Sequence, residues 1–224
     1  PIIHYNTNYI LLLYIMLASN LNNKETRIWS GLKKRISDEP VAVFMMGIPA
    51  SGKSTTVNVV LEHMGYTRSD FLDIDPDIFM ESLNDYNNTR ARDFNKSGVV
   101  IASNIMKKIH SSSRKYKYIY FGTGKNYASY ITMINKAKKA GYMTVLVNVE
   151  IDISTAINRA SKRSRKVSPS VISNIDRRLK TKHTRTVSKR KVSLTGYEIL
   201  HDKVDQAYVI NNNGSTPVIV YHKN

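Results

Sequence analysis

The sequence predicts an α/β fold of three layers, in which helices cover both faces of a central, mostly parallel sheet. Segments typical of strands alternate with segments of helical periodicity along most of the 224 residues, a pattern that predicts a parallel sheet with crossover helices. The run VAVFMM (41–46) is apolar throughout, as in a strand buried on both faces. Hydrophobic residues make up 42% of the chain, which is enough for one α/β core.

The expected elements alternate along the chain. The expected helices span residues 23–36, 53–63, 76–83, 88–112, 126–141, 153–163, 168–182 and 195–204. The expected strands span residues 41–46, 69–75, 116–121, 142–149, 206–211 and 217–222. Ser168 and Pro169 are typical of an N-cap and a first helical residue, and Gly141 is typical of a helix end. Gly98 predicts a break within residues 88–112.

One domain is expected, with a tail at each end. Residues 23–211 are predicted to form the domain, residues 1–22 an N-terminal tail, and residues 212–224 a C-terminal strand or tail. The apolar run Tyr9–Ala18 is shorter than the ~20 residues that span a bilayer, and it lacks the basic start of a secretory signal. Met16 is interpreted as the natural start. A weakly membrane-associating tail is the alternative.

The composition restricts partners and metal chemistry. Because the chain has no cysteine, disulfides and thiolate zinc sites are excluded, and a reducing, cytoplasmic setting is the simplest expectation. The formal net charge is +17, and residues 151–192 carry 13 basic side chains against two acidic ones. This segment is expected to attract anions such as nucleotides, nucleotide sugars or nucleic acid. A solvated basic face is the alternative.

The segment GIPASGKST (47–55) carries the clearest functional motif. It matches G-x-x-x-x-G-K-[ST] between an expected strand and an expected helix, the context of a phosphate-binding P-loop. The backbone N–H groups of such a loop bind phosphate oxygens, while Lys53 would reach the β- and γ-phosphates and Ser54 would bind Mg²⁺. ATP and Mg²⁺ are therefore the predicted cofactors. The residues assigned to nucleotide binding are Gly47, Ile48, Pro49, Ala50, Ser51, Gly52, Lys53, Ser54 and Thr55.

Two aspartates follow the second expected strand. Asp75 and Asp77 leave that strand at its carboxyl end, where ligands bind in open α/β sheets. A kinase needs one carboxylate to accept the hydroxyl proton and often another on the metal side. Asp77 is assigned as the general base and Asp75 as the metal-side residue. The alternative is a structural role at the start of the helix from Pro76, where Asp75 would be a good N-cap.

An ordered series of motifs resembles the zeta toxin family. The series covers roughly residues 41–179 and consists of Gly47–Ser54, Ile74–Phe79, Gly122–Gly124, Ala140–Tyr142, Asn158–Ala160 and Ser168–Pro169. The P-loop is shared by many proteins, so the motifs after it make the resemblance specific. The resemblance implies a P-loop kinase-like fold and phosphorylation of the 3′-hydroxyl of the sugar in UDP-N-acetylglucosamine.

The resemblance also implies residues on the acceptor side and in a lid. Thr123 and Lys125 would face the acceptor, and Arg159, with Arg165 or Lys166, would close over the phosphates. Mobile guanidinium groups stabilise the charge of a phosphoryl group in transfer. Lys53, Asp77, Arg159 and Arg165 are thus the expected catalytic residues, and Lys166 is an expected substrate contact. A solvated helical face is the alternative for Arg159.

The sequence departs from the family pattern on the acceptor side. Phe121 stands where the family has a glutamate, and Lys125 stands where it has an arginine. A further acidic contact of the family has no counterpart near Ser103 and Asn104. A lysine meets a phosphate as a point charge, without the bidentate fork of an arginine.

Three functions are compatible with these features. The first is an ATP-dependent small-molecule kinase acting on a nucleotide sugar or a related phosphorylated metabolite. The second is a polynucleotide or nucleoside kinase that holds its substrate on residues 151–192, and the third is a nucleotide-dependent nucleic acid-binding protein without phosphotransfer. Tyr116, Tyr118 and Tyr120 share one face of a strand, where core packing is expected and base stacking is the alternative. The acceptor and any antitoxin partner are left open.

Overall fold

The computed structural model describes residues 25–26, 29–30, 36–83, 91–187 and 190–223. These residues fall into two compact units. One unit consists of residues 75–108 with the described residues before position 35, and the other consists of residues 35–74 and 109–224. Each unit is described by itself below.

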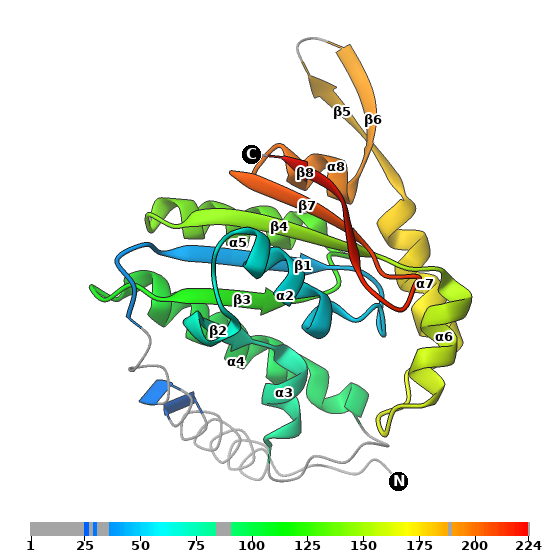
Figure 1. Cartoon of the computed structure of the whole chain (residues 1–224), viewed down its shortest axis with the longest axis horizontal. Helices are drawn as coiled ribbons and strands as arrows, with labels where there is room; N and C mark the ends of the chain where they lie inside the picture. Colours follow the sequence, from blue (N-terminus) through cyan, green and yellow to red (C-terminus); the bar gives the residue numbers. More distant parts are fainter. Residues whose placement is uncertain (1–24, 27–28, 31–35, 84–90, 188–189, 224) are drawn as a thin grey trace, which may run out of the picture. The chain divides into compact units, whose positions relative to one another are not determined.

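The larger unit is built on a six-stranded sheet (Figure 1). In sheet order, its strands are β2 (Phe71–Ile74), β3 (Lys117–Phe121), β1 (Val41–Met46), β4 (Met143–Glu150), β7 (Gln206–Asn211) and β8 (Val218–Lys223). The first five strands are parallel, and β8 pairs with β7 in the antiparallel direction at the edge. The mostly parallel sheet that the sequence predicts is therefore confirmed.

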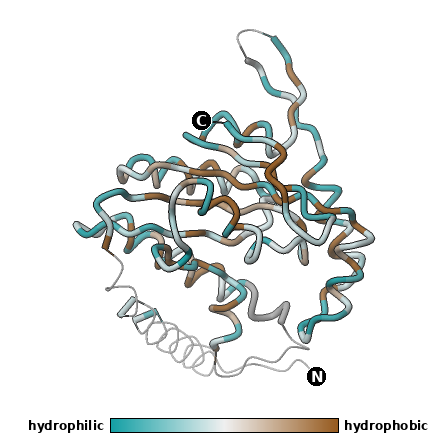
Figure 2. The backbone as a smooth tube through the Cα atoms, viewed as in Figure 1, coloured by the Kyte–Doolittle hydropathy of each residue, from teal (hydrophilic) through white to brown (hydrophobic). Residues whose placement is uncertain are grey.

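The central strand β1 is buried on both faces. Val41, Val43 and Met45 pack in one cluster with buried residues of α2 (Lys53–His63). Because side chains alternate along a strand, Phe44 points to the other face, where its ring centroid lies 6.4 Å from that of Tyr130 of α5 (Tyr127–Lys139). Figure 2 shows hydrophobic residues concentrated on the strands of this sheet. The continuous apolar run of β1 is thus explained by a helix on each side.

The three alternating tyrosines, two in β3 and one directly before it, are core residues. Tyr116, Tyr118 and Tyr120 are all buried. The ring of Tyr118 meets Phe44 edge-on at 6.2 Å, and that of Tyr120 meets Tyr130 edge-on at 5.8 Å. Core packing is confirmed, and base stacking is wrong, because no face of these rings is open to a nucleobase.

The remaining described elements are mostly those that the sequence predicts. They are η1 (Arg68–Asp70), α3 (Pro76–Glu81), α4 (Ala91–Ser111), α6 (Ile153–Ser161), α7 (Pro169–Lys180) and α8 (Gly196–His201). The Ser168 hydroxyl caps α7 by accepting from the Val171 N–H at 3.4 Å. Gly141, at φ 83°, follows the end of α5. No helix within the described residues combines the length and apolarity needed to cross a membrane.

Two expectations near the N-terminus lie wholly or mostly outside the described residues. Most of the expected helix 23–36 lies outside them, although Glu25, Thr26, Trp29 and Ser30 are helical. Its expected last residue, Ile36, is not helical, because it forms an antiparallel bridge with Tyr116. The apolar run 9–18 also lies outside the described residues.

A hairpin in the basic segment was not predicted. β5 (Lys182–Val187) and β6 (Arg190–Thr195) form a separate antiparallel sheet that extends beyond the six-stranded one (Figure 1). One face of the hairpin carries only basic and hydroxyl residues, and on the other face basic residues interrupt Val187, Val192 and Leu194. The apolar alternation by which strands are recognised is therefore weak. β8 was predicted as a strand or tail, and it belongs to the main sheet.

The break predicted at Gly98 is wrong, because α4 runs through it without interruption. In the smaller unit, a Cβ at Gly98 would lie 2.2 Å from the Pro76 carbonyl oxygen and 3.0 Å from the Met80 Cβ. The glycine therefore permits close packing of α4 against α3. Helix packing has overridden the usual cost of about 1 kcal/mol for glycine in a helix.

Gly98→Ala should destabilise the protein. Alanine normally favours a helix over glycine, but here the added methyl overlaps the α3 backbone, and overpacking of this kind costs about 1–3 kcal/mol. Urea unfolding would show the loss, with Ser97→Ala, at the neighbouring position of the same helix, as control. A Gly98→Ala protein as stable as wild type would mean that this contact does not limit the spacing of α3 and α4.

His110 should make stability pH-dependent. Burial, with Lys115 and Lys136 nearby, lowers its pKa from 6.5 to about 4, and its Nε2 lies 2.8 Å from the Tyr118 hydroxyl. Between these two pKa values the unfolded chain binds more protons than the folded one, so stability falls as pH drops through this window. His110→Gln should flatten this part of the curve of unfolding free energy against pH. Superimposable slopes for variant and wild type would contradict the prediction.

Candidate active site

The P-loop lies between β1 and α2 and turns through unusual backbone angles. The φ values of Gly47, Ala50 and Gly52 are 139°, 61° and 85°. A Cβ at Gly47 would lie 2.6 Å from the carbonyl oxygen of Val149, so no larger residue fits at the entry to the loop. Ala50 holds a left-handed conformation that non-glycine residues rarely adopt, and such strain is concentrated at functional sites.

Lys53 and Ser54 begin α2 directly after this turn. The Lys53 ammonium donates to the carbonyl oxygens of Gly47 and Ile48 at 3.0 and 2.9 Å. The side chain therefore folds back over the loop, where it can meet phosphate oxygens. Ser54 is exposed in the first helical turn, where the positive end of the helix dipole adds to the attraction for anions.

The turn after β3 adjoins the P-loop. The Gly47 N–H donates to the Thr123 carbonyl oxygen at 3.1 Å, which brings together two segments that the sequence separately assigned to donor and acceptor. Lys125 is exposed two residues later. Tyr130 lies next to this turn, because a Cβ at Gly122 would be 2.1 Å from its hydroxyl, and that hydroxyl donates to the Met45 carbonyl oxygen of β1 at 2.7 Å. Burial raises the pKa of Tyr130 well above 10, so this hydroxyl remains a donor.

Sequence reasoning missed a third segment of the site, at the end of β7. The buried Asn212 amide donates to the Ser51 carbonyl oxygen at 2.7 Å. The Arg159 guanidinium of α6 donates to the Asn212 carbonyl oxygen at 3.1 Å. The available signal was the polar run Asn211–Asn213 at the carboxyl end of an apolar strand, because ligand sites of parallel sheets form at that edge.

The three residues predicted to form a lid, Arg159, Arg165 and Lys166, have different surroundings. Hydrogen bonds connect Arg159 to the P-loop through Asn212. Arg165 lies half-buried in the loop between α6 and α7. Lys166 is exposed and donates to the Ser161 carbonyl oxygen at the end of α6. The structure thus connects Arg159 to the P-loop and holds Lys166 at the end of α6, while their role in a lid stays a prediction.

The two candidate carboxylates belong to the smaller unit. Asp75 is the N-cap of α3, and its carboxylate accepts from the Asp77 N–H at 2.9 Å. The capping role that the sequence left open is therefore confirmed for Asp75. Asp77 is half-buried in the first turn of α3. The roles of Asp75 at a metal and of Asp77 as base stay predictions.

The described residues contain no cluster of three or more histidine or acidic side chains that could hold a metal. Mg²⁺ in nucleotide sites is bound by few protein groups, with water and phosphate oxygens completing the octahedron. In the P-loop, Ser54 would supply such a ligand.

The family model described as Zeta toxin matches residues 27–222. The chain belongs to the zeta toxin family. Together with the parallel sheet and the P-loop, membership of the zeta toxin family supports a nucleotide-dependent kinase.

Two solved structures share the fold of this zeta toxin family member at low identity. One is described as a characterization of the PezAT chromosomal toxin-antitoxin system of Streptococcus pneumoniae, with a TM-score of 0.63 and 14% identity over 91% of this chain and 81% of that chain. The other is AvrRxo1-ORF1:AvrRxo1-ORF2 with ATP, with a TM-score of 0.58 and 12% identity over 97% of this chain and 68% of that one. No curated protein matches the sequence. At these identities the likeness establishes the fold alone.

The acceptor side of this zeta toxin family member differs from the pattern of the resemblance. Phe121 is part of the buried core, with the Arg68 guanidinium 5.2 Å from its ring centroid, so it offers no polar group to an acceptor. In the smaller unit, Asn104 donates to the Glu25 carboxylate at 3.3 Å, and Lys108 forms an ion pair with the same carboxylate. A carboxylate is therefore present beside Asn104, although it comes from a distant part of the sequence.

The basic hairpin reaches the same end of the sheet. Tyr127, two residues after Lys125, lies against it: the ring centroid of His183 is 4.5 Å from that of Tyr127. The Arg185 guanidinium lies 5.6 Å above the Tyr127 ring centroid, within the range of a cation–π contact. Positive charge from β5 is therefore brought to the helix that follows the Thr123 turn.

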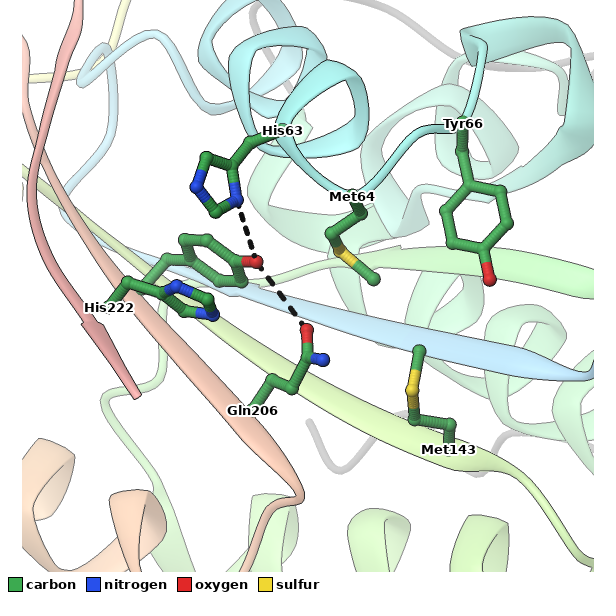
Figure 3. A pocket seen from close by; sticks show the side chains of 7 residues that line it. His63, Met64, Tyr66, Met143, Gln206 and His222 are labelled. Atoms are coloured by element: carbon green, nitrogen blue, oxygen red, sulfur yellow. Dashed lines mark hydrogen bonds between the residues drawn. The ribbon is translucent and has the colours of Figure 1, made fainter. Parts of the chain in front are cut away.

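A pocket lies elsewhere, at the amino ends of β4 and β7 (Figure 3). Its volume is about 460 Å³, and it is lined by His63, Met64, Tyr66, Met143, Gln206, Tyr208 and His222. His63 Nδ1 lies 3.2 Å from the Tyr208 hydroxyl. The pocket is at the opposite end of the parallel strands from the P-loop and contains none of the predicted site residues.

Gly52→Ala should weaken nucleotide binding far more than Gly65→Ala. Both glycines have positive φ, 85° and 78°, so both variants carry the same kind of strain. A Cβ at Gly52 would lie 2.4 Å from the Asn212 amide nitrogen, whereas Gly65 faces open space. In equilibrium titration with an ATP analogue, we expect at least about tenfold weaker binding, or 1.4 kcal/mol, for Gly52→Ala alone. Equal affinities for the two variants would show that the crowded turn is unimportant.

Proposed function

We propose that this zeta toxin family member transfers the γ-phosphate of ATP to a hydroxyl of a small phosphorylated metabolite. A nucleotide sugar such as UDP-N-acetylglucosamine is the first candidate acceptor. The observation that supports this proposal best is the hydrogen bond from Gly47 to the Thr123 carbonyl. It places the turn assigned to the acceptor directly beside the loop assigned to the donor.

The donor half uses the P-loop backbone and four side chains. The N–H groups of the loop bind the phosphates, Lys53 neutralises charge on the β- and γ-phosphates, and Ser54 holds the metal. Bound Mg²⁺ would supply charge neutralisation between the β- and γ-phosphates. Arg159, which is hydrogen-bonded to the P-loop region through Asn212, contributes a guanidinium to the transferred group. Arg165, in the loop after α6, adds a second one.

The acceptor half uses Asp77, Thr123, Lys125 and Lys166. Asp77 accepts the proton of the acceptor hydroxyl, while the hydroxyl oxygen forms a bond to the γ-phosphorus and the bond to the bridging oxygen of ADP breaks. Lys125 and Lys166 are exposed cations suited to a phosphorylated acceptor. Asp75, which caps α3, is proposed to bind the metal through water.

An antitoxin is proposed as a partner, because a structure with the same fold is described as part of a toxin-antitoxin system. The net charge of +17 would favour an acidic partner.

The second candidate function is a polynucleotide kinase, and the hairpin β5–β6 favours it. Lys182, Arg185, Arg190 and Lys191 lie on a projecting element whose base contacts Tyr127. A nucleic acid backbone could follow such an element while its 5′-end occupies the same acceptor turn. Affinity that falls steeply with salt would mark this function.

Transfer of labelled γ-phosphate from ATP to a panel of acceptors tests the proposal. The panel contains UDP-N-acetylglucosamine, other nucleotide sugars, nucleosides and 5′-hydroxyl oligonucleotides, each with Mg²⁺ at low and high salt. Labelling of a nucleotide sugar supports the small-molecule kinase. Labelling of oligonucleotides alone, lost at high salt, moves the function to the second candidate. ATP binding with no labelled acceptor contradicts both.

Asp77→Asn should abolish most of the transfer and leave nucleotide affinity unchanged. The amide keeps the size of the carboxylate but cannot accept the proton, so we expect kcat to fall about 100- to 10,000-fold. Asp73→Asn is the matched control, because Asp73 is an exposed residue of β2 that pairs with Arg68 at 2.5 Å. It should keep its rate. A fully active Asp77→Asn protein would exclude Asp77 as the base.

A further inference from the structure

We propose that Asn212 is a positioning residue of the nucleotide site, which fixes the P-loop through Ser51 and couples it to Arg159 of the lid helix α6. The kinetic part of this inference rests on the proposed kinase function. The geometric part rests on four hydrogen bonds of the segment Asn211–Asn213. One reaches the P-loop, one reaches the end of β4, and two reach α6, at its N-cap and near its C-terminal end.

The Asn212 side chain is held in one orientation. The residue is 6% exposed, and its amide nitrogen donates to the Ser51 carbonyl oxygen at 2.7 Å. Its backbone N–H donates to the Glu150 carbonyl oxygen at 2.9 Å. Because β4 and β7 are neighbouring parallel strands, this second bond fixes the loop after β7 to the end of the adjacent strand. The backbone that positions the Asn212 amide against the P-loop is therefore fixed to the sheet.

The amide also fills the space beside the turn into α2. A Cβ at Gly52 would lie 2.4 Å from the Asn212 amide nitrogen, so the amide packs directly on the glycine backbone. Ser51 and Gly52 immediately precede Lys53, whose ammonium contacts the Gly47 and Ile48 carbonyls. A shift of Ser51 would therefore displace the lysine that reaches the phosphates.

The same loop contacts α6 at two places. The Arg159 guanidinium donates to the Asn212 carbonyl oxygen at 3.1 Å. The backbone N–H of Asp152, the N-cap of α6, donates to the Asn213 side-chain oxygen at 2.7 Å. The segment Asn212–Asn213 is thus hydrogen-bonded both to α6, which carries Arg159, and to the P-loop. In our proposal Asn212 acts through Ser51 and Arg159 and needs no contact with the nucleotide.

Asn212→Asp tests the first link with the smallest change of shape. It removes the amide donor and sets a carboxylate oxygen against the Ser51 carbonyl, where both groups are acceptors and repel. We expect ADP to bind at least about tenfold more weakly, which corresponds to the loss of one buried hydrogen bond. Calorimetric titration with ADP measures this without any acceptor. Asn58→Asp, which puts the same charge on an exposed position of α2, should bind ADP within about twofold of wild type.

A steady-state measurement separates positioning from stability. If Asn212 positions the P-loop, Asn212→Ala should raise the KM for ATP while the folded variant keeps most of its kcat. If it served stability alone, the melting temperature would fall and the ADP affinity of the folded protein would be unchanged. That second outcome would overturn the proposal.

The link to Arg159 is tested by a double-mutant cycle. Asn212→Ala keeps the carbonyl that Arg159 contacts but loosens the loop that presents it. The effects of Asn212→Ala and Arg159→Gln on kcat/KM should therefore be non-additive by about threefold or more. Additive effects would overturn the coupling.

The outcomes distinguish this inference from the proposed function. A wild-type protein that does not bind ADP would overturn both. A wild-type protein that binds ADP and transfers phosphate, beside an Asn212→Asp variant of equal affinity, would overturn this inference and leave the kinase intact.

Discussion

The turn from β1 into α2 is the constraint on which the rest of the site depends. It reverses the chain at the carboxyl end of β1, a central strand that is buried on both faces. Two groups from neighbouring segments already occupy the space beside this turn. The Val149 carbonyl lies where a Cβ at Gly47 would be, and the Asn212 amide lies where one at Gly52 would be. Glycine at both positions lets the backbone turn its N–H groups inward, and this turn is what makes a phosphate site.

The neighbouring strands then supply support at the same edge. β1 is flanked by β3 and β4, and β7 follows β4. Because all four are parallel, their carboxyl ends meet around the P-loop, and each end contributes a contact: Thr123 after β3, and Asn212 after β7 bonded to the end of β4. Arg159 joins this arrangement through the Asn212 carbonyl. The sheet topology therefore determines which distant segments, here those after β3 and β7, lie against the P-loop.

Features that depend on local sequence were the predictable ones. The apolar run of β1, the P-loop and the Ser168 cap each follow from a few neighbouring residues, and the structure contains all three. Features that depend on tertiary contacts were not predictable. Gly98 looks like a helix break until α3 is known to lie against it, and nothing in Asn211–Asn213 alone indicates Ser51 as a partner. The hairpin β5–β6 was not predicted because basic residues interrupt the few apolar residues on its one partly apolar face.

The two halves of the site are built from different materials, and this explains where the chain departs from the family pattern. The donor half consists mainly of backbone groups, whose positions are fixed by glycine and by strand ends, so few substitutions are compatible with it. The acceptor half consists of side chains, which can change without disturbing the sheet. Phe121 turns inward to the core, where the family pattern has a glutamate. Lys125 keeps the positive charge of the family's arginine at the same position, and β5 brings a second cation, Arg185, to the nearby ring of Tyr127. This side of the site therefore loses an acidic group and keeps its positive charge.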